Sequence, residues 1–289
     1  MQTPLRCLAI AVVVLNLASE AQAQLFSRNL PPYRTVLNIT YVTNGQWEGK
    51  LDVYARIDPP VAAPTLVWLN VRPKSGVIFS FLPYMELGWN VVSVEIFVHD
   101  VTVAPVALQN TLCALRWIIR NGHDYDLDAG KLVVSGASAG GWFAVAAALG
   151  VRPEHWTNAC PGDEEPRVAA VVNWFGNWDL ADILQGPNQK PYAARWVRGL
   201  PDPLEVARAL SPLPLRQALP PVISIHGDAD PIVPYTQSTR LHEALRDARV
   251  PEQLITIPGG GHGGFSRDEN RRAFAEVERF LAANGLSGQ

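Results

Sequence analysis

The sequence predicts an α/β fold with a mostly parallel central sheet, an antiparallel hairpin at the N-terminal end and helices on both faces. Strand-like and helix-like segments alternate along the chain, which is the arrangement that builds an open α/β sheet. The apolar runs show no alternation with polar residues, as expected for strands covered on both faces. Five such runs are present, at 65–69, 90–98, 131–135, 168–174 and 221–225.

Residues 35–43 and 50–57 differ from these runs, because their apolar and polar side chains alternate and a turn sequence, Asn44-Gly45, follows the first. They predict the antiparallel hairpin. Residues 105–121 place leucine and isoleucine at the spacing of one helix face, and residues 266–283 show a similar pattern in the last helix. Both helices are therefore expected to cover the sheet.

The N-terminal segment, residues 1–23, is typical of a secretory signal peptide. Arg6 precedes an apolar run over 7–18 that is too short to span a bilayer, and Ala21-Gln22-Ala23 has the small-x-small pattern of a cleavage site. A buried first helix is the alternative interpretation. Residues 24–289 are then predicted to be a single domain that is periplasmic or secreted, with no membrane anchor after cleavage.

Two stretches rich in proline and tryptophan, at about 151–167 and 176–220, interrupt the alternation and are predicted to be insertions over the sheet. Cys113 and Cys160 remain after export into an oxidising compartment, where disulfides form. Sequence alone leaves two possibilities for them, a disulfide or two buried free thiols.

The composition and the motifs that are missing exclude several function classes. With 48% hydrophobic and 18% charged residues the chain is typical of a globular protein, and a net charge of −3 provides no basic surface for nucleic acid. No H-E-x-x-H or C-x-x-C spacing predicts a metal site, and no G-x-G-x-x-G follows a strand. The sequence therefore predicts no metal and no cofactor, and it gives no indication of oligomeric state.

The sequence from Gly136 to Gly140, Gly-Ala-Ser-Ala-Gly, follows a predicted strand and precedes an alanine-rich helix. G-x-S-x-G between a strand and a helix is the context of a nucleophile elbow. So tight a turn forces its central residue to a positive φ, and the helix N-terminus favours negative charge beside it. Ser138 is thus the predicted nucleophile, and a glycine and serine turn without activity is the alternative.

A serine nucleophile needs a base, and His262 is the preferred candidate among six histidines. It lies in the glycine-rich loop 258–264 and follows the candidate acids, which gives the order Ser, Asp, His expected for this type of site. His226 fits that order less well. Two candidate acids follow a buried strand, and we favour Asp230, which a proline follows, over Asp228, for which a loop-capping role is the alternative.

These motifs resemble the α/β-hydrolase superfamily, and within it the bacterial feruloyl/acetyl-xylan esterase-like and hormone-sensitive-lipase-like serine esterases. The resemblance is clearest at 114–117, 128–141, 225–234 and 258–265. It implies an α/β-hydrolase fold and a hydrolase that cleaves carboxylic esters through an acyl-enzyme without a cofactor. Small esters or acyl groups on plant polysaccharide are the implied substrates. A peptidase or arylformamidase on the same fold, and a non-enzymatic binding protein with a degraded site, are the alternatives.

One segment departs from this pattern. The family usually has His-Gly-Gly after the strand that corresponds to 65–69, and backbone N–H groups there form half of the oxyanion hole. Asn70, Val71 and Arg72 stand in that place. Ala139 retains one donor N–H, and the second donor is either the Val71 N–H, which we favour, or the Asn70 side-chain amide.

The chain has nine tryptophans, several of them near the motifs. Trp142 and Trp178 are predicted to line the substrate pocket, where indole rings could stack on a sugar. Packing in the core is the alternative for each of them.

Overall fold

The computed structural model describes residues 30–45, 47–57, 63–71, 77–97, 103–151, 160, 162–211, 215 and 219–288. The predicted signal peptide lies outside these residues. So do Arg72 and parts of both predicted insertions.

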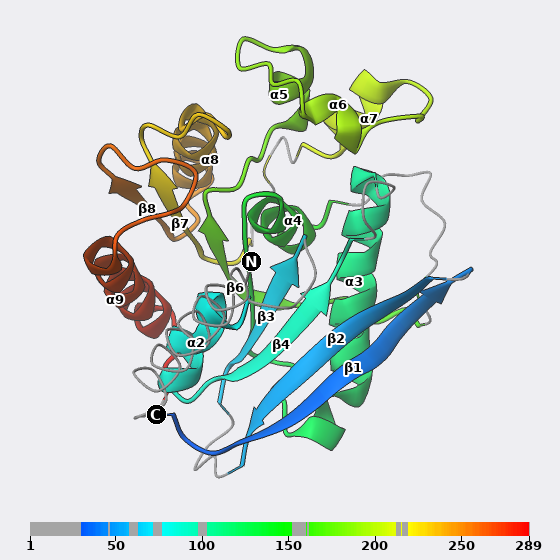
Figure 1. The fold of residues 1–289 in the computed structure, drawn as a ribbon, viewed down its shortest axis with the longest axis vertical. Helices are drawn as coiled ribbons and strands as arrows, with labels where there is room; N and C mark the ends of the chain where they lie inside the picture. Colours follow the sequence, from blue (N-terminus) through cyan, green and yellow to red (C-terminus); the bar gives the residue numbers. More distant parts are fainter. Residues whose placement is uncertain are drawn as a thin grey trace, which may run out of the picture.

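Eight strands within the described residues form one sheet, in the order β1-β2-β4-β3-β5-β6-β7-β8 (Figure 1). β1 pairs antiparallel with β2 and β2 antiparallel with β4, whereas the remaining neighbours are parallel. The strand bounds are β1 Tyr33–Asn44, β2 Trp47–Arg56, β3 Thr65–Asn70, β4 Asn90–Glu95, β5 Leu132–Ala137, β6 Val168–Trp174, β7 Val222–Gly227 and β8 Glu252–Ile257. The predicted mostly parallel sheet with an N-terminal antiparallel hairpin is confirmed.

Helices cover both faces of this sheet, as predicted. α2 and α9 lie on one face, and α3, α4 and α8 lie on the other (Figure 1). Two successive residues of β3 pack on opposite faces of the sheet: Trp68 lies in the core under α2 and α9, and Leu69 lies in the core on the other face. Both faces of the strand are therefore buried, which explains why its sequence is apolar throughout. The helix bounds are α2 Ile78–Glu86, α3 Ala104–Asn121, α4 Ala139–Ala148, α5 Leu180–Gln185, α6 Ala193–Trp196, α7 Pro203–Ala209, α8 Thr236–Asp247 and α9 Arg267–Ala283.

β8 is absent from the sequence prediction. It is the last strand at one edge of the sheet, and its residues are mostly half-exposed. An edge strand that is not buried on both faces lacks the continuous apolar run by which the other parallel strands were identified.

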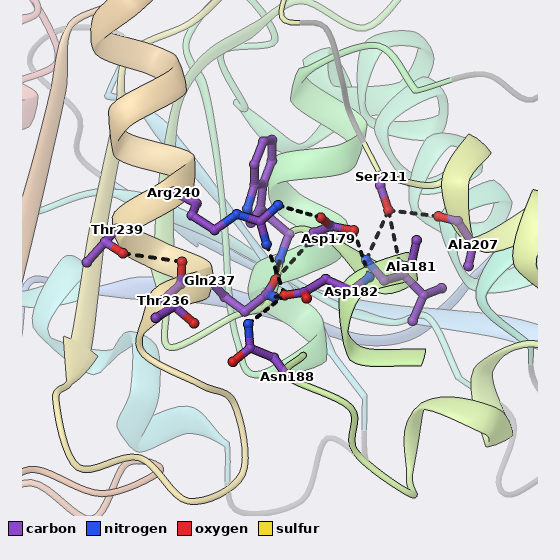
Figure 2. A network of polar contacts seen from close by, with 12 residues as sticks. Asp179, Ala181, Asp182, Asn188, Ala207, Ser211, Thr236, Gln237, Thr239 and Arg240 are labelled. Atoms are coloured by element: carbon purple, nitrogen blue, oxygen red, sulfur yellow. Dashed lines mark hydrogen bonds and ion pairs between the residues drawn. The ribbon is translucent and has the colours of Figure 1, made fainter. Parts of the chain in front are cut away.

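The segment between β6 and β7 forms the short helices α5, α6 and α7, which lie beyond the carboxyl ends of the strands (Figure 1). A polar network fixes α5 on α8, as Figure 2 shows. Arg240 of α8 pairs with Asp179 at 2.8 Å and with Asp182 at 2.9 Å. The Gln237 side chain donates to Asp182 and accepts from the Trp178 and Asp179 backbone N–H groups. The first two turns of α8 are thus held firmly against α5 and the residues that precede it.

A disulfide joins Cys113 of α3 to Cys160, with a Cα–Cα distance of 5.1 Å. Of the two possibilities left open by the sequence, the structure therefore contains the bridge. It crosslinks α3 to the connection that leads into β6. No helix among the described residues has both the length and the apolar character needed to cross a membrane.

Candidate active site

The turn between β5 and α4 has the geometry that its glycines allow. Ser138 is the N-cap of α4 with φ 56° and ψ −122°, and its backbone N–H donates to Trp174 O at 2.8 Å. A Cβ on Gly136 would lie 2.6 Å from the carbonyl carbon of Gly140, and a Cβ on Gly140 would overlap Leu69 O. Strand and helix can approach this closely only because both positions are glycine. The strained φ of Ser138 is the conformation predicted for the centre of such a turn.

The structure places His262 between Ser138 and Asp230. His262 Nε2 lies 2.8 Å from Ser138 Oγ, and His262 Nδ1 lies 2.7 Å from Asp230 Oδ2. An ionised carboxylate can only accept, so Nδ1 carries the proton and Nε2 is left to accept from the serine hydroxyl. The imidazole side chain is 21% exposed whereas the Asp230 side chain is fully buried, so a substrate can reach the base but not the acid.

The Asp230 carboxylate is held as an anion. Its Oδ1 accepts the Ile232 N–H at 2.8 Å and the Val233 N–H at 3.0 Å. Burial alone would raise the pKa of Asp230, but the hydrogen bonds from His226, His262 and the Ile232 N–H outweigh it and hold the pKa well below its usual range. Asp230 is therefore charged wherever His262 needs a partner for its imidazolium form.

Asp228 has a different position. Its Oδ1 accepts the Gly259 N–H at 2.6 Å, at the start of the loop that carries His262. This is the loop-capping contact that the sequence left as the alternative for Asp228.

The segment between β6 and β7 touches the acid loop directly. Lys190 Nζ donates to Pro231 O at 3.0 Å, and the Tyr192 hydroxyl donates to Ile232 O at 3.2 Å. Burial, with a smaller effect of the Asp230 charge, raises the pKa of Tyr192 to about 12, so its hydroxyl stays a donor. The segment between β6 and β7 therefore helps to hold the backbone whose N–H groups bind Asp230.

The two proposed sources of the second oxyanion donor differ in the structure. Both hydrogens of the Asn70 amide are engaged, with Ser93 Oγ at 2.9 Å and Val94 O at 3.1 Å. The side chain of Asn70 is thus committed to the sheet, which argues against it as an oxyanion donor. Ala139 is the first residue of α4, so its N–H has no acceptor within the helix. The end of β3 lies close to the N-terminus of α4, since a Cβ on Gly140 would overlap Leu69 O. Val71 follows β3 directly, and the Val71 N–H therefore remains the candidate for the second oxyanion donor.

The predicted role of Trp142 and Trp178 in a substrate pocket is corrected. Trp142 is fully buried and Trp178 is 2% exposed, so neither ring can meet a substrate. α4 turns Trp142 into the core, where its ring lies 4.6 Å from that of Phe143 and 5.5 Å from that of Trp196. Core packing, the alternative for both tryptophans, describes them correctly.

Two other tryptophans border an open space. A groove of about 880 Å³ lies between α2 and α9, and it reaches Ala137 and Gly263, the sequence neighbours of Ser138 and His262. Its walls are rich in aromatic side chains: Trp68, Phe79, Tyr84, Trp174, Phe175, Phe265 and Phe274. The groove adjoins the candidate active site without containing it, because neither Ser138 nor His262 is among its lining residues.

Sequence reasoning missed Phe175, which borders both the groove and the histidine. Its ring stands edge-on to that of His262 at 4.9 Å and to that of Phe265 at 5.7 Å. Phe175 has a φ of 41°, which is unusual for a bulky side chain. Such strain is characteristic of functional sites, but no sequence pattern reveals it.

The described residues contain no cluster of His, Cys, Asp and Glu side chains that could hold a metal ion.

Comparison with known proteins finds curated relatives that are named esterases. Esterase LipQ of Mycobacterium tuberculosis is 29% identical over 228 residues, which are 73% of this chain and 52% of LipQ. Esterase LipC of the same organism is 28% identical over 234 residues, which are 74% of this chain and 56% of LipC. The chain thus spans about half the length of these curated relatives.

Solved structures show the same fold. A truncated carbohydrate esterase from gut microbiota has a TM-score of 0.70 at 22% identity, covering 88% of this chain and 99% of that one. The esterase Est2 of Thermogutta terrifontis has a TM-score of 0.68 at 22% identity, covering 90% and 94%. The bifunctional GH43-CE protein of Bacteroides eggerthii has a TM-score of 0.69 at 28% identity, covering 86% of this chain and 38% of its own.

The α/β-hydrolase fold predicted from the sequence is confirmed by these structures. The BD-FAE family matches residues 74–245, which is more than half of the chain and includes both Ser138 and Asp230. The protein therefore belongs to the BD-FAE family of α/β-hydrolases.

Proposed function

We propose that the protein is a carboxylic-ester hydrolase that acts through an acyl-enzyme on Ser138. The observation that carries this proposal is the hydrogen-bonded series Ser138, His262 and Asp230, with distances of 2.8 Å and 2.7 Å. This is the geometry of an activated serine nucleophile. The esterase names of the curated relatives support ester hydrolysis as the reaction.

In the first half-reaction Ser138 Oγ attacks the ester carbonyl carbon while its proton passes to His262 Nε2. The negative charge on the carbonyl oxygen is stabilised by the Ala139 N–H and by the Val71 N–H. Collapse of the tetrahedral intermediate breaks the bond to the alcohol, which takes the proton from His262. Asp230 stabilises the imidazolium throughout without itself becoming protonated.

In the second half-reaction water gives a proton to His262 Nε2 and attacks the acyl carbon. The new tetrahedral intermediate collapses, Ser138 Oγ leaves with that proton, and the carboxylic acid is released. The proposal requires neither a metal nor a cofactor, since proton transfer and charge stabilisation are supplied by the side chains and backbone N–H groups named here.

For the substrate we propose a small ester or an acyl group on plant polysaccharide, and for the location the periplasm or the exterior. A carbohydrate esterase and a GH43-CE protein among the structural neighbours support the polysaccharide. The aromatic groove, which reaches Ala137 and Gly263, supports an apolar acyl group as the part of the substrate that binds there. The signal-peptide pattern at 1–23 and the disulfide support export, because disulfides persist in oxidising compartments.

A fluorophosphonate probe tests the proposal, because it labels only an activated serine. Wild-type protein should be labelled, Ser138→Ala should not, and aryl acetates should be hydrolysed faster than matched anilides. Full labelling of Ser138→Ala would refute Ser138 as the nucleophile. Faster cleavage of the anilides would instead favour the peptidase or arylformamidase reading, and an unlabelled folded wild type would favour the binding protein.

A further inference from the structure

A second histidine reaches the carboxylate that orients His262. His226, near the end of β7, is fully buried, and its Nε2 lies 3.2 Å from Asp230 Oδ2 and 3.1 Å from Val233 O. Its Nδ1 lies 2.6 Å from Ser238 Oγ on α8. Both ring nitrogens of His226 are therefore engaged, and one of them contacts the candidate catalytic acid.

These partners fix the tautomer of His226. A carboxylate and a backbone carbonyl can only accept, so Nε2 must carry the proton and donate to both. A neutral ring then leaves Nδ1 as an acceptor, which the Ser238 hydroxyl satisfies. Asp230 and Val233 O thus set the tautomer of His226, and the Ser238 hydroxyl, which can donate or accept, donates to Nδ1 in response.

His226 also closes the acid loop. Asp230 Oδ1 accepts N–H groups from Ile232 and Val233, while His226 Nε2 binds the same carboxylate at Oδ2 together with Val233 O. The Asp230 carboxylate and the backbone of the acid loop therefore both form hydrogen bonds to the buried His226 ring. Rotation of the carboxylate away from His262 would break several of these bonds at once.

We infer that His226 is a positioning residue that holds the Asp230 carboxylate in the orientation His262 requires, with its own ring held from the other side by Ser238. The inference rests on the proposed function, since it concerns the same acid. The depressed pKa of Asp230 agrees with it. Burial alone would raise that pKa, and the hydrogen bond from His226 is the leading contribution against it.

Contacts between α8 and α5 hold Ser238 in place. Its neighbour Gln237 holds the backbone of Trp178 and Asp179, and Arg240 pairs with Asp179 and Asp182 one turn further on (Figure 2). Ser238 therefore lies on a turn of α8 that cannot shift without breaking the contacts to α5. This anchoring lets a single hydroxyl hold the His226 ring from the side opposite Asp230.

The chain contains a matched control in His242. This ring is 1% exposed, and its Nδ1 lies 2.6 Å from Glu252 Oε2 while its Nε2 lies 2.7 Å from Ser224 Oγ. It thus has the same partner types as His226, a carboxylate and a serine. Its carboxylate is Glu252, however, and not the acid that orients His262.

The experiment compares His226→Leu, His226→Gln and His242→Leu by kcat, KM and melting temperature on an aryl acetate. His226→Leu should lower kcat about 10- to 100-fold, the range for a lost hydrogen bond to a charged group, with KM changed less than about threefold. His226→Gln keeps an amide N–H for Asp230 and should recover kcat to within about threefold. His242→Leu should lower the melting temperature but leave kcat of the folded enzyme unchanged.

Folded His226→Leu with wild-type kcat would overturn the inference, as would an equal loss of kcat in His242→Leu. If His226→Leu does not fold, Ser238→Ala decides. It should lower kcat about three- to tenfold, because the His226 ring loses the hydrogen bond that holds it from the α8 side, and unchanged kcat would again overturn the inference. Ser138→Ala separates the two proposals, because full activity in that variant refutes the proposed nucleophile, whereas an inactive Ser138→Ala beside an unaffected His226→Leu refutes only the positioning role.

Discussion

Removing the disulfide between Cys113 and Cys160 should destabilise the protein strongly without changing its chemistry. The two cysteines are 47 residues apart in the chain, and the crosslink restricts the unfolded state of that whole loop. In the chain-entropy model a loop of this length loses about 14 cal/mol/K, which corresponds to about 4 kcal/mol at 25 °C. This is a large part of the roughly 5–15 kcal/mol by which a typical domain is stable.

Urea unfolding can measure this effect by two independent routes. The oxidised wild type is compared with the wild type reduced by dithiothreitol and with the Cys113→Ala/Cys160→Ala double variant. Reduction keeps both sulfur atoms, so it reports the crosslink alone, whereas the double variant also loses the packing of Cys113, which is buried in the core. We expect reduction to lower the free energy of unfolding by about 2–5 kcal/mol and the double variant to lose somewhat more.

The activity of the folded protein provides the control. The three residues of the hydrogen-bonded series come from other elements than the two cysteines, so kcat at low temperature should be the same in all three samples. Equal unfolding midpoints for oxidised and reduced protein would refute the argument, because a closed loop of this length must restrict the unfolded chain. A thiol titration of the purified protein establishes beforehand that the bond has formed.

Four further predictions follow from the site. Asp230→Asn should lower kcat up to ~10⁴-fold because it favours the wrong tautomer of His262, whereas Asp228→Asn should cost less than about tenfold, as steady-state kinetics will show. Asn70→Ala should leave kcat within about threefold, and a loss of 10²–10³ would reinstate its amide as an oxyanion donor. Trp142→Ala should cost about 3–5 kcal/mol in urea unfolding without raising the KM of the folded enzyme. The depressed pKa of Asp230 contributes stability above the pKa of the unfolded carboxyl, about 3.9, which is lost as the pH falls towards the folded value. Asp230→Asn should therefore flatten the acid side of the stability profile, and an unchanged slope below pH 4 would contradict this.

The sequence predicted most of the fold because burial imposes its own pattern. β3, β5, β6 and β7 lie inside the sheet with helices on both faces, so each is a recognisable apolar run. The hairpin of β1 and β2 is equally readable, because its strands alternate and a turn joins them. β8 was missed for the opposite reason. It is an edge strand that is only partly buried, so its sequence shows neither a continuous apolar run nor a clear alternation of apolar and polar residues.

The site residues that a local sequence pattern marks could be predicted, and those whose role depends on distant contacts could not. Ser138 and His262 are marked by local glycine patterns that a tight turn and a close loop require, and the structure brings the two together. The pocket role of Trp142 fails because contacts with Trp196, far along the chain, decide which way the ring faces. His226 was set aside as the base because it precedes the candidate acids in the chain, and nothing in the sequence indicated that it contacts Asp230. Its role depends on α8, which the sequence did not connect to the site.

The two aspartates after β7, which compete for one role in the sequence, have complementary roles in space. The Asp228 carboxylate accepts the Gly259 N–H, and the neighbouring Ala229 N–H donates to Gly260 O at 3.0 Å, so one side-chain bond and one backbone bond join the acid loop to the histidine loop. Asp230, two residues on, then meets the imidazole of His262 from a loop whose distance to it is already fixed. A side chain that had to reach across two independent loops would lose the conformational entropy of both. The close spacing of the two carboxylates is therefore what allows a short glycine-rich loop to present its histidine at hydrogen-bonding distance from Ser138.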